Sequence, residues 1–394
     1  MTEKGANQNT IQEMNRSLIL NVLRKQGVCS RAKISRITGL QQATITYIVN
    51  DLIKWKLVTE TGLMTGKKGR RSIGISINND VYRVIGVCLT RSYFSIGVFN
   101  LSGKLLESEQ IDTVGNSPLD VLKKLKISLS GYIAKSKKKI LSIGIGIPGP
   151  FIHDKNHIAL MTGVPGWENI DIKTELETEF NIPIFMEHDA NAGAYAQNWF
   201  VKDIKPSDVL LYVTMSAGIG AGVITNHEIF RGFLGTAGEI GHMSICFDGP
   251  ECECGNLGCL EKYASSHAFA DAISQKLQKK TSFEQAVKLV ENNNDIAIQE
   301  YKNCCKMLGV ALVNTVNILN PNIIVIGCEM AHVAPKILLE TVDEVIKERT
   351  MLALTDQLII KISNIEKGSV LMGAAVIAIN EVLKNSSQLI DVKS

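Results

Sequence analysis

The 394 residues are 45% hydrophobic and 21% charged, as in an ordinary globular protein with room for two or three domains. No apolar run approaches the roughly 18–20 residues of a membrane span, and nine irregularly spaced cysteines argue against a secreted disulfide scaffold, so we expect a cytoplasmic protein without membrane association. The net charge of +3 combines 13 Lys/Arg against 5 Asp/Glu in residues 1–80 with 29 against 34 in the remainder. This imbalance indicates that the N-terminal part meets a polyanion, although a solvated basic surface would show it too.

The first two predicted helices lie before residue 40. Four apolar residues at helical spacing predict the buried face of a helix over residues 10–25: Ile11, Met14, Leu18 and Val22. Ser30 is placed to cap a short second helix that carries Ile34 and Ile37. Gly39 is expected to end that helix in a left-handed conformation.

A third helix is predicted directly after this turn. Its inward positions, at i, i+3, i+4 and i+7, are Ile45, Ile48, Val49 and Leu52. The second and third helices then form a helix–tight turn–helix unit, the arrangement that presents its second helix to the major groove of DNA. Any three-helix bundle could show these periodicities, so motif, charge and position carry the DNA-binding prediction together.

Polar side chains on this unit are the predicted DNA contacts. They are Ser30, Arg31, Gln41, Gln42, Thr44, Thr46, Tyr47 and Asn50. Glutamine can pair with adenine and threonine can meet a thymine methyl group, whereas the flanking cations position phosphates. Two alternating strands around a basic, glycine-rich tip then predict a wing, whose Arg70 and Arg71 are expected in a narrow minor groove. We therefore predict a winged helix-turn-helix domain over residues 1–79.

From residue 81 onward, strand meanders alternate with helices, and the pattern occurs twice. The predicted strands lie at 84–89, 94–99, 105–107, 140–147 and 182–187, and then at 209–215, 222–225, 323–326 and 358–362. This order predicts an α/β body in two lobes. We expect the first lobe over residues 80–191 plus about 370–394, and the second lobe over residues 192–369.

One imidazole and three thiols follow one another in the second lobe: His242, Cys252, Cys254 and Cys259. The set matches a closed tetrahedral zinc site, and thiolates favour zinc over magnesium or calcium. Gly255 and Gly258 would let the backbone fold round one ion. Buried or disulfide-paired cysteines are the alternative, but three thiols leave one over. We predict a structural Zn²⁺.

The stretch from Gly238 to Glu261 resembles the signature of the ROK family, which contains bacterial sugar kinases and sugar-responsive repressors. The resemblance extends over nearly the whole chain, and residues 30–52 and 69–71 resemble the DNA-binding head of xylose-type ROK repressors. It implies an actin-like sugar-kinase fold with a ligand cleft between the lobes. The effector contacts that it implies are Asp189, His188, Glu239, His242 and Glu261.

The same resemblance predicts that kinase activity is lost. Family kinases place an Asp, glycines and a Thr after the first strand, whereas this chain has Cys88, Thr90 and Arg91 in the matching stretch. Side chains there would keep the backbone from approaching a phosphate, and magnesium prefers oxygen to sulfur. Asp189 then occupies a vestigial catalytic-base position, or simply caps a helix. Residues 218–222 resemble the second phosphate turn, although a tight β-turn would look the same.

We therefore predict a sugar-responsive transcriptional repressor of carbohydrate-utilisation genes, and no enzyme. It would bind operator DNA as a homodimer, or as a tetramer, with a dimerisation surface on the second lobe. A sugar or sugar phosphate would occupy the kinase-like cleft. An ATP-dependent sugar kinase with an added DNA-binding head is one alternative. A repressor controlled by a protein partner, with no ligand in the cleft, is another.

Overall fold

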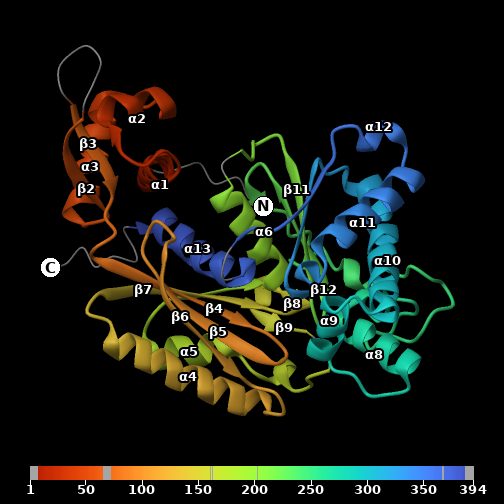
Figure 1. Cartoon of the computed structure of the whole chain (residues 1–394). Helices are drawn as coiled ribbons and strands as arrows, with labels where there is room; N and C mark the ends of the chain where they lie inside the picture. Colours follow the sequence, from red (N-terminus) through yellow and green to blue (C-terminus); the bar gives the residue numbers. More distant parts are fainter. Residues whose placement is uncertain are drawn as a thin grey trace.

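The computed structural model describes residues 8–64, 72–159, 161, 163–201, 203–365 and 368–386. A small N-terminal head lies against a larger body of two lobes, each built round a five-stranded sheet (Figure 1). Within these residues, no helix is long and apolar enough to cross a bilayer.

The head contains three helices and a three-stranded sheet. Its elements are α1 (Gln8–Gln26), β1 (Cys29–Ser30), α2 (Arg31–Thr38), α3 (Gln42–Lys54), β2 (Val58–Met64) and β3 (Ser72–Ile77), with β3 central in the antiparallel sheet. Ser30 caps α2 by accepting a hydrogen bond from the Lys33 N–H at 3.2 Å, and Gly39 ends it at φ 74°. Both predictions are confirmed. The predicted inward face of α3 is also buried throughout.

The predicted face of α1 is wrong. Ile11, Met14 and Leu18 are 48%, 64% and 41% exposed, and Ile37 of α2 is exposed as well. Val22 is buried as predicted, but the other buried apolar residues of α1 are Ile19, Leu20 and Leu23. The reason is that α1 packs on two sides, against α2 and β3 of the head and against helix α13 of the body, so its buried face is set by partners far along the chain.

The two lobes repeat one strand order. In each sheet the first three strands are antiparallel neighbours, and the fourth and fifth are added in parallel on the other side of the first. The first sheet is formed by β4 (Tyr82–Leu89), β5 (Tyr93–Phe99), β6 (Leu105–Asp112), β7 (Lys139–Ile147) and β10 (Ile184–His188). The second is formed by β11 (Val209–Met215), β12 (Ile219–Thr225), β13 (Glu228–Ile229), β14 (Ile323–Gly327) and β15 (Ile359–Ile362). The α/β character predicted from the repeated pattern is confirmed.

Helices cover both sheets. On the first sheet, α4 and α5 lie on one face, and α13 lies on the other, where it also packs along α6 (Figure 1). The longer helices of the body are α4 (Pro118–Lys135), α5 (Ile172–Phe180), α6 (Asp189–Phe200), α8 (Ser266–Leu277), α9 (Phe283–Glu291), α10 (Asp295–Leu319), α11 (Pro335–Arg349) and α13 (Ser369–Lys384). The shorter ones are α7 (Glu261–Ala264) and α12 (Leu352–Thr355), and β8 (Phe151–Ile152) pairs with β9 (His157–Ile158). A side chain at Gly373 of α13 would collide with the Ala192 carbonyl oxygen of α6, so glycine permits the close packing of these two helices.

Head and body share one continuous apolar core. The Tyr82 hydroxyl at the start of β4 donates to the Trp55 carbonyl oxygen at 2.9 Å. The Arg24 guanidinium of α1 stacks 3.8 Å from the ring centroid of Trp199 in α6. A cavity of about 320 Å³ remains between α1, α6 and α13. The head is therefore docked on the body at two separate places.

Candidate functional site

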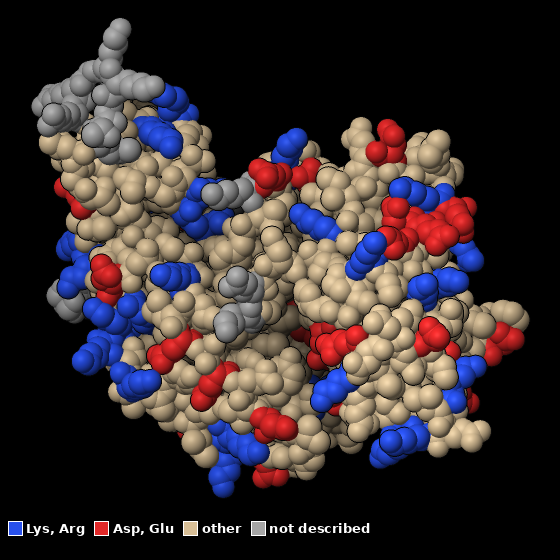
Figure 2. Space-filling model, in the orientation of Figure 1, with Lys and Arg blue, Asp and Glu red and all other residues tan. Residues whose placement is uncertain are grey.

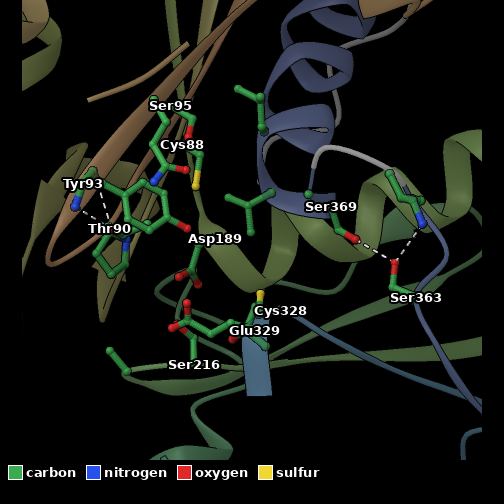
Figure 3. A pocket seen from close by; sticks show the side chains of 18 of the residues that line it. Cys88, Thr90, Tyr93, Ser95, Asp189, Ser216, Cys328, Glu329, Ser363 and Ser369 are labelled. Atoms are coloured by element: carbon green, nitrogen blue, oxygen red, sulfur yellow. Dashed lines mark hydrogen bonds between the residues drawn. The ribbon is translucent and has the colours of Figure 1, made fainter. Parts of the chain in front are cut away.

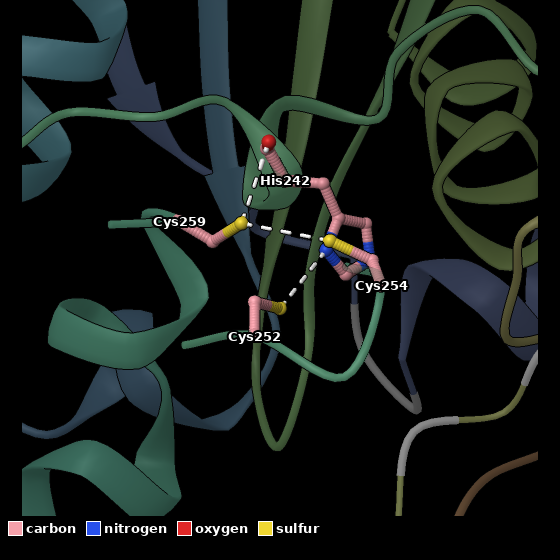
Figure 4. Close-up of side chains that lie close together, drawn as sticks. All are labelled: His242, Cys252, Cys254 and Cys259. Atoms are coloured by element: carbon pink, nitrogen blue, oxygen red, sulfur yellow. Dashed lines mark hydrogen bonds between the residues drawn. The ribbon is translucent and has the colours of Figure 1, made fainter. Parts of the chain in front are cut away.

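The four predicted metal ligands lie together in the second lobe (Figure 4). All their ligand atoms are within 4.8 Å of one another, with His242 Nδ1 3.7 Å from Cys252 Sγ and Cys254 Sγ 3.7 Å from Cys259 Sγ. A tetrahedron with metal–sulfur bonds of about 2.3 Å has edges of about 3.8 Å, so these separations fit a bound metal. The cluster could hold a metal ion.

The loop that carries the cluster is shaped by two glycines. Gly255 and Gly258 adopt φ angles of +91° and +65°, and a Cβ at Gly258 would lie 1.7 Å from the Cys246 carbonyl oxygen. The Asn256 amide donates to the His242 carbonyl oxygen at 3.1 Å, which ties His242 to the loop that carries the three cysteines. The backbone role predicted for both glycines is confirmed.

Next to this loop, polar side chains from both lobes converge. His188 ends β10 and Asp189 begins α6, with His188 Nε2 3.3 Å from Asp189 Oδ1 and 4.0 Å from Glu239 Oε1. Burial raises the pKa values of Asp189 and Glu239, although the charge of His188 opposes this shift when that ring is protonated. The structure thus brings together three of the residues predicted to contact an effector.

Glu261, the third carboxylate among the predicted effector contacts, is held by Arg91 from the opposite lobe. Arg91 Nη2 lies 3.3 Å from Glu261 Oε1, and Arg91 Nη1 donates to the Ala217 carbonyl oxygen at 2.8 Å. The other carboxylate oxygen of Glu261 accepts from the Ile219 N–H at 3.0 Å. A Cβ at Gly218 would lie 2.8 Å from Arg91 Nη2, so the guanidinium fills the space beside the second glycine turn.

Glu187, which is buried near the end of β10, is a site residue that was not predicted from the sequence. Its Oε1 accepts from the Asn191 amide at 3.0 Å and from the His188 N–H at 3.1 Å, and its Oε2 accepts from Arg231 Nε at 3.1 Å. The available signal was an acidic residue at the end of a buried strand, directly before His188. Glu187 positions the start of α6 and links the two lobes through Arg231.

A cavity of about 800 Å³ opens between the lobes and reaches Asp189 (Figure 3). Figure 2 shows the hollow between the lobes from outside, with acidic side chains near its rim. Cys88 lines the cavity at the end of β4, and burial raises the pKa of its thiol well above the ordinary value, so the group stays neutral. Magnesium is bound by oxygen atoms, and a neutral thiol at this position supplies none.

The predicted DNA contacts that the structure describes lie at the start of α2 and along α3. Gln41, Gln42, Thr46, Tyr47 and Asn50 are exposed, and Ser30, Arg31 and Thr44 are half-buried. Arg31 Nη2 donates to Asn50 Oδ1 at 3.4 Å and to Glu60 Oε1 at 3.1 Å, which holds these groups as one surface. Arg70 and Arg71, the predicted minor-groove contacts, lie outside the described residues.

Comparison with known proteins defines the family. A family model described as the ROK family matches residues 84–381. The chain belongs to the ROK family. The xylose repressor of Caldicellulosiruptor bescii is 32% identical to it, over 96% of this chain and 98% of that protein.

Two solved ROK structures place the chain within the family. A ROK family transcriptional regulator, described as a homolog of the E. coli Mlc protein, is 26% identical with a TM-score of 0.82, covering 95% of this chain and 97% of its own. The ROK hexokinase from Thermus thermophilus is 27% identical with a TM-score of 0.64, covering 99% of its own chain but only 76% of this one. The hexokinase therefore matches less of this chain than the regulator does.

Proposed function

We propose that this ROK protein is a sugar-responsive transcriptional repressor of carbohydrate-utilisation genes. Its relatives include proteins named as xylose repressors and as an N-acetylglucosamine repressor. The observation that carries the proposal is the contact of Arg24 in α1 of the head with Trp199 in α6, the helix that begins at Asp189 in the cleft. One rigid element thus joins the polar site to the head.

The head acts as a winged helix-turn-helix domain in this proposal. The exposed face of α3 enters the major groove, with Gln42, Thr46 and Asn50 facing the bases and Arg31 facing a phosphate. Such domains read two half-sites as a dimer, which is why we propose a homodimer or a tetramer. Arg70 and Arg71 would contact the minor groove at the wing.

In the second lobe, the cluster holds a structural Zn²⁺. Three thiolates and one imidazole complete its coordination, so the ion supplies rigidity and no open position for catalysis. Because His242 faces the cluster through Nδ1, its Nε2 is left for a ligand hydroxyl or a neighbouring carboxylate. The loop is thereby fixed next to Glu239 and Glu261.

The cleft binds a sugar through hydroxyl groups. Asp189, Glu239 and Glu261 offer carboxylate acceptors, and His188 stands between two of them. We infer that no phosphoryl transfer follows, because Arg91 fills the space beside Gly218 and Cys88 supplies no magnesium ligand. The kinase alternative keeps only Asp189 and the glycine turn in its favour.

Coupling to DNA runs along α6. A sugar bound at Asp189 shifts the N-terminal end of α6, and Trp199 at its other end carries Arg24 of α1 with it. A sugar can shift the equilibrium only by its different affinities for the DNA-competent and DNA-incompetent forms. A coupling free energy of roughly 1–3 kcal/mol would change operator affinity 5–150-fold.

The test is binding of the full-length protein to fragments of its own genome, with and without a panel of sugars and sugar phosphates. We expect selective DNA binding that one sugar releases. Asn50→Ala should lose this DNA binding, whereas Gln299→Ala, a control at an exposed position of α10, should keep it. Absence of selective binding would overturn the proposal, and ATP consumption on the same panel would then be measured. Selective binding that ignores every sugar would instead indicate a protein partner.

A further inference from the structure

The cavity between the lobes is larger than one sugar ring bound at the carboxylates would fill. It begins at Asp189 and extends to Ser369 and Leu371 at the start of α13 (Figure 3). Its volume of about 800 Å³ falls in the range of roughly 300–1,000 Å³ that encloses drug-sized molecules. A single sugar ring is smaller than such molecules, whereas a glycoside of two rings reaches their size.

The charges on the cavity wall disfavour a phosphate group. Asp189, Glu109 and Glu329 line it, and among the described lining residues Arg91 is the only lysine or arginine. The Arg91 guanidinium is already bonded to the Ala217 carbonyl oxygen and to Glu261. In the part of this wall that the structure describes, a phosphate would therefore meet three carboxylates, the neighbouring His332, and one guanidinium that is already engaged.

Beside Glu109, strands β5 and β6 also give the cavity a group of neutral polar side chains. Ser95 of β5 pairs with Gln110 of β6. Tyr93 is two residues from Ser95 in β5, and Ser108 is two residues from Gln110 in β6, so all four side chains lie on the same face of the sheet. Figure 3 shows the Tyr93 ring directed into the cavity. Its hydroxyl makes no hydrogen bond in the described part of the chain, and burial raises its pKa, so it stays a neutral donor. Hydroxyl and amide groups beside an aromatic ring suit a neutral sugar.

We propose that the effector is a neutral oligosaccharide of at least two rings, and this inference rests on the sugar-responsive function proposed above. The first ring lies at His188, Asp189 and Glu239. The second ring continues past Asp189 into the cavity, against Tyr93 and Ser95. The step is binding alone, and no bond in the sugar is broken.

Calorimetry on the full-length protein tests this with D-xylose, D-glucose, xylobiose, cellobiose and glucose 6-phosphate as probes. We expect at least one disaccharide to bind 10-fold or more tightly than its own monosaccharide, and the phosphate to bind more weakly than glucose. A monosaccharide or the phosphate that binds as tightly as every disaccharide would overturn the inference.

A cavity-filling variant locates the second ring. Ser95→Trp should weaken disaccharide binding about 10-fold and leave the monosaccharide unchanged, whereas Ser102→Trp, on the exposed β5–β6 turn, should change neither. Retained operator binding shows that both variants fold. Equal loss of both sugars in Ser95→Trp would contradict the assignment. If no sugar binds while operator binding is intact, the sugar response itself is overturned, and this inference with it.

Discussion

The two lobes share one strand order but differ at the turn between their first two strands. In the second lobe, the turn keeps Gly218, and the Ser216 N–H bonds to the Gly218 carbonyl oxygen at 3.0 Å. In the first lobe, the Thr90 hydroxyl and N–H both bond to the Tyr93 carbonyl oxygen, and Arg91 extends across to the other turn. The same backbone scaffold therefore carries a glycine turn in the second lobe and, in the first lobe, a turn whose Arg91 side chain occupies the space beside that glycine.

This difference shows that topology alone does not decide what the cleft can do. The repeated sheets place both turns at the cleft, but a phosphate needs two turns whose backbone N–H groups it can reach. Arg91 removes that access and replaces it with a link between the lobes. This agrees with our proposal that the kinase-like cleft binds a ligand without transferring a group.

The second lobe also has the Cys/His cluster, and its removal should have the largest effect. We expect Cys252→Ala to lose the proposed zinc and about 3–5 kcal/mol of stability, or ~5 °C in Tm for a chain of 394 residues, because the loop then has no other crosslink. Metal analysis and thermal unfolding measure this. Cys246→Ala, an exposed thiol of the same loop that lies outside the cluster, should change neither quantity. Equal stability of the two variants would show that the cluster is not a metal site.

Making the two turns alike is the second test. Arg91→Gly leaves the buried Glu261 carboxylate without its cation, so we expect a loss of about 3 kcal/mol in the free energy of unfolding. ATP consumption should stay absent, because Cys88 still offers no magnesium ligand. Ser92→Gly, an exposed position in the same turn, should cost less than about 0.5 kcal/mol. A gain of ATP turnover in Arg91→Gly would mean that Arg91 alone separates this chain from a kinase.

The features that sequence predicted correctly are local. The Ser30 cap, the buried face of α3 and the metal cluster each depend on residues within about two dozen positions, where spacing fixes geometry. The Arg91–Glu261 pair joins residues 170 positions apart, and Glu187–Arg231 joins residues 44 apart. Only the packing of the lobes brings these groups together. The same reason explains the error on α1, since its second partner, α13, is at the other end of the chain.

The head contacts the body at Arg24–Trp199 and at Tyr82–Trp55, and we expect the first contact to carry the coupling. Arg24→Leu removes the stack on Trp199, and we expect the sugar's effect on operator affinity to fall about 5–30-fold, equivalent to ~1–2 kcal/mol, while sugar affinity itself is retained. Arg24→Lys should give an intermediate loss, because the charge remains without the planar stack. A Trp199→Leu variant adding nothing to Arg24→Leu would confirm that the two act as one contact. If the sugar response is unchanged in Arg24→Leu, the coupling must instead pass through the contact between Tyr82 and Trp55.

The smallest expected effect is a pH response at Asp189, which faces His188, Arg91 and Glu261 in the cleft. Because burial raises its pKa above the ordinary 3.8, the folded protein holds a proton over a pH range in which the unfolded chain has lost it. Its contribution to stability therefore falls as pH rises through that range. Sugar affinity should change in the opposite direction, since a protonated carboxyl accepts one fewer hydrogen bond. We expect about threefold weaker binding (~0.7 kcal/mol) as pH falls through the raised pKa. Calorimetry over a pH series measures this change, and Asp189→Asn should flatten it, whereas a slope that survives in Asp189→Asn would assign the titration to another group of the cleft.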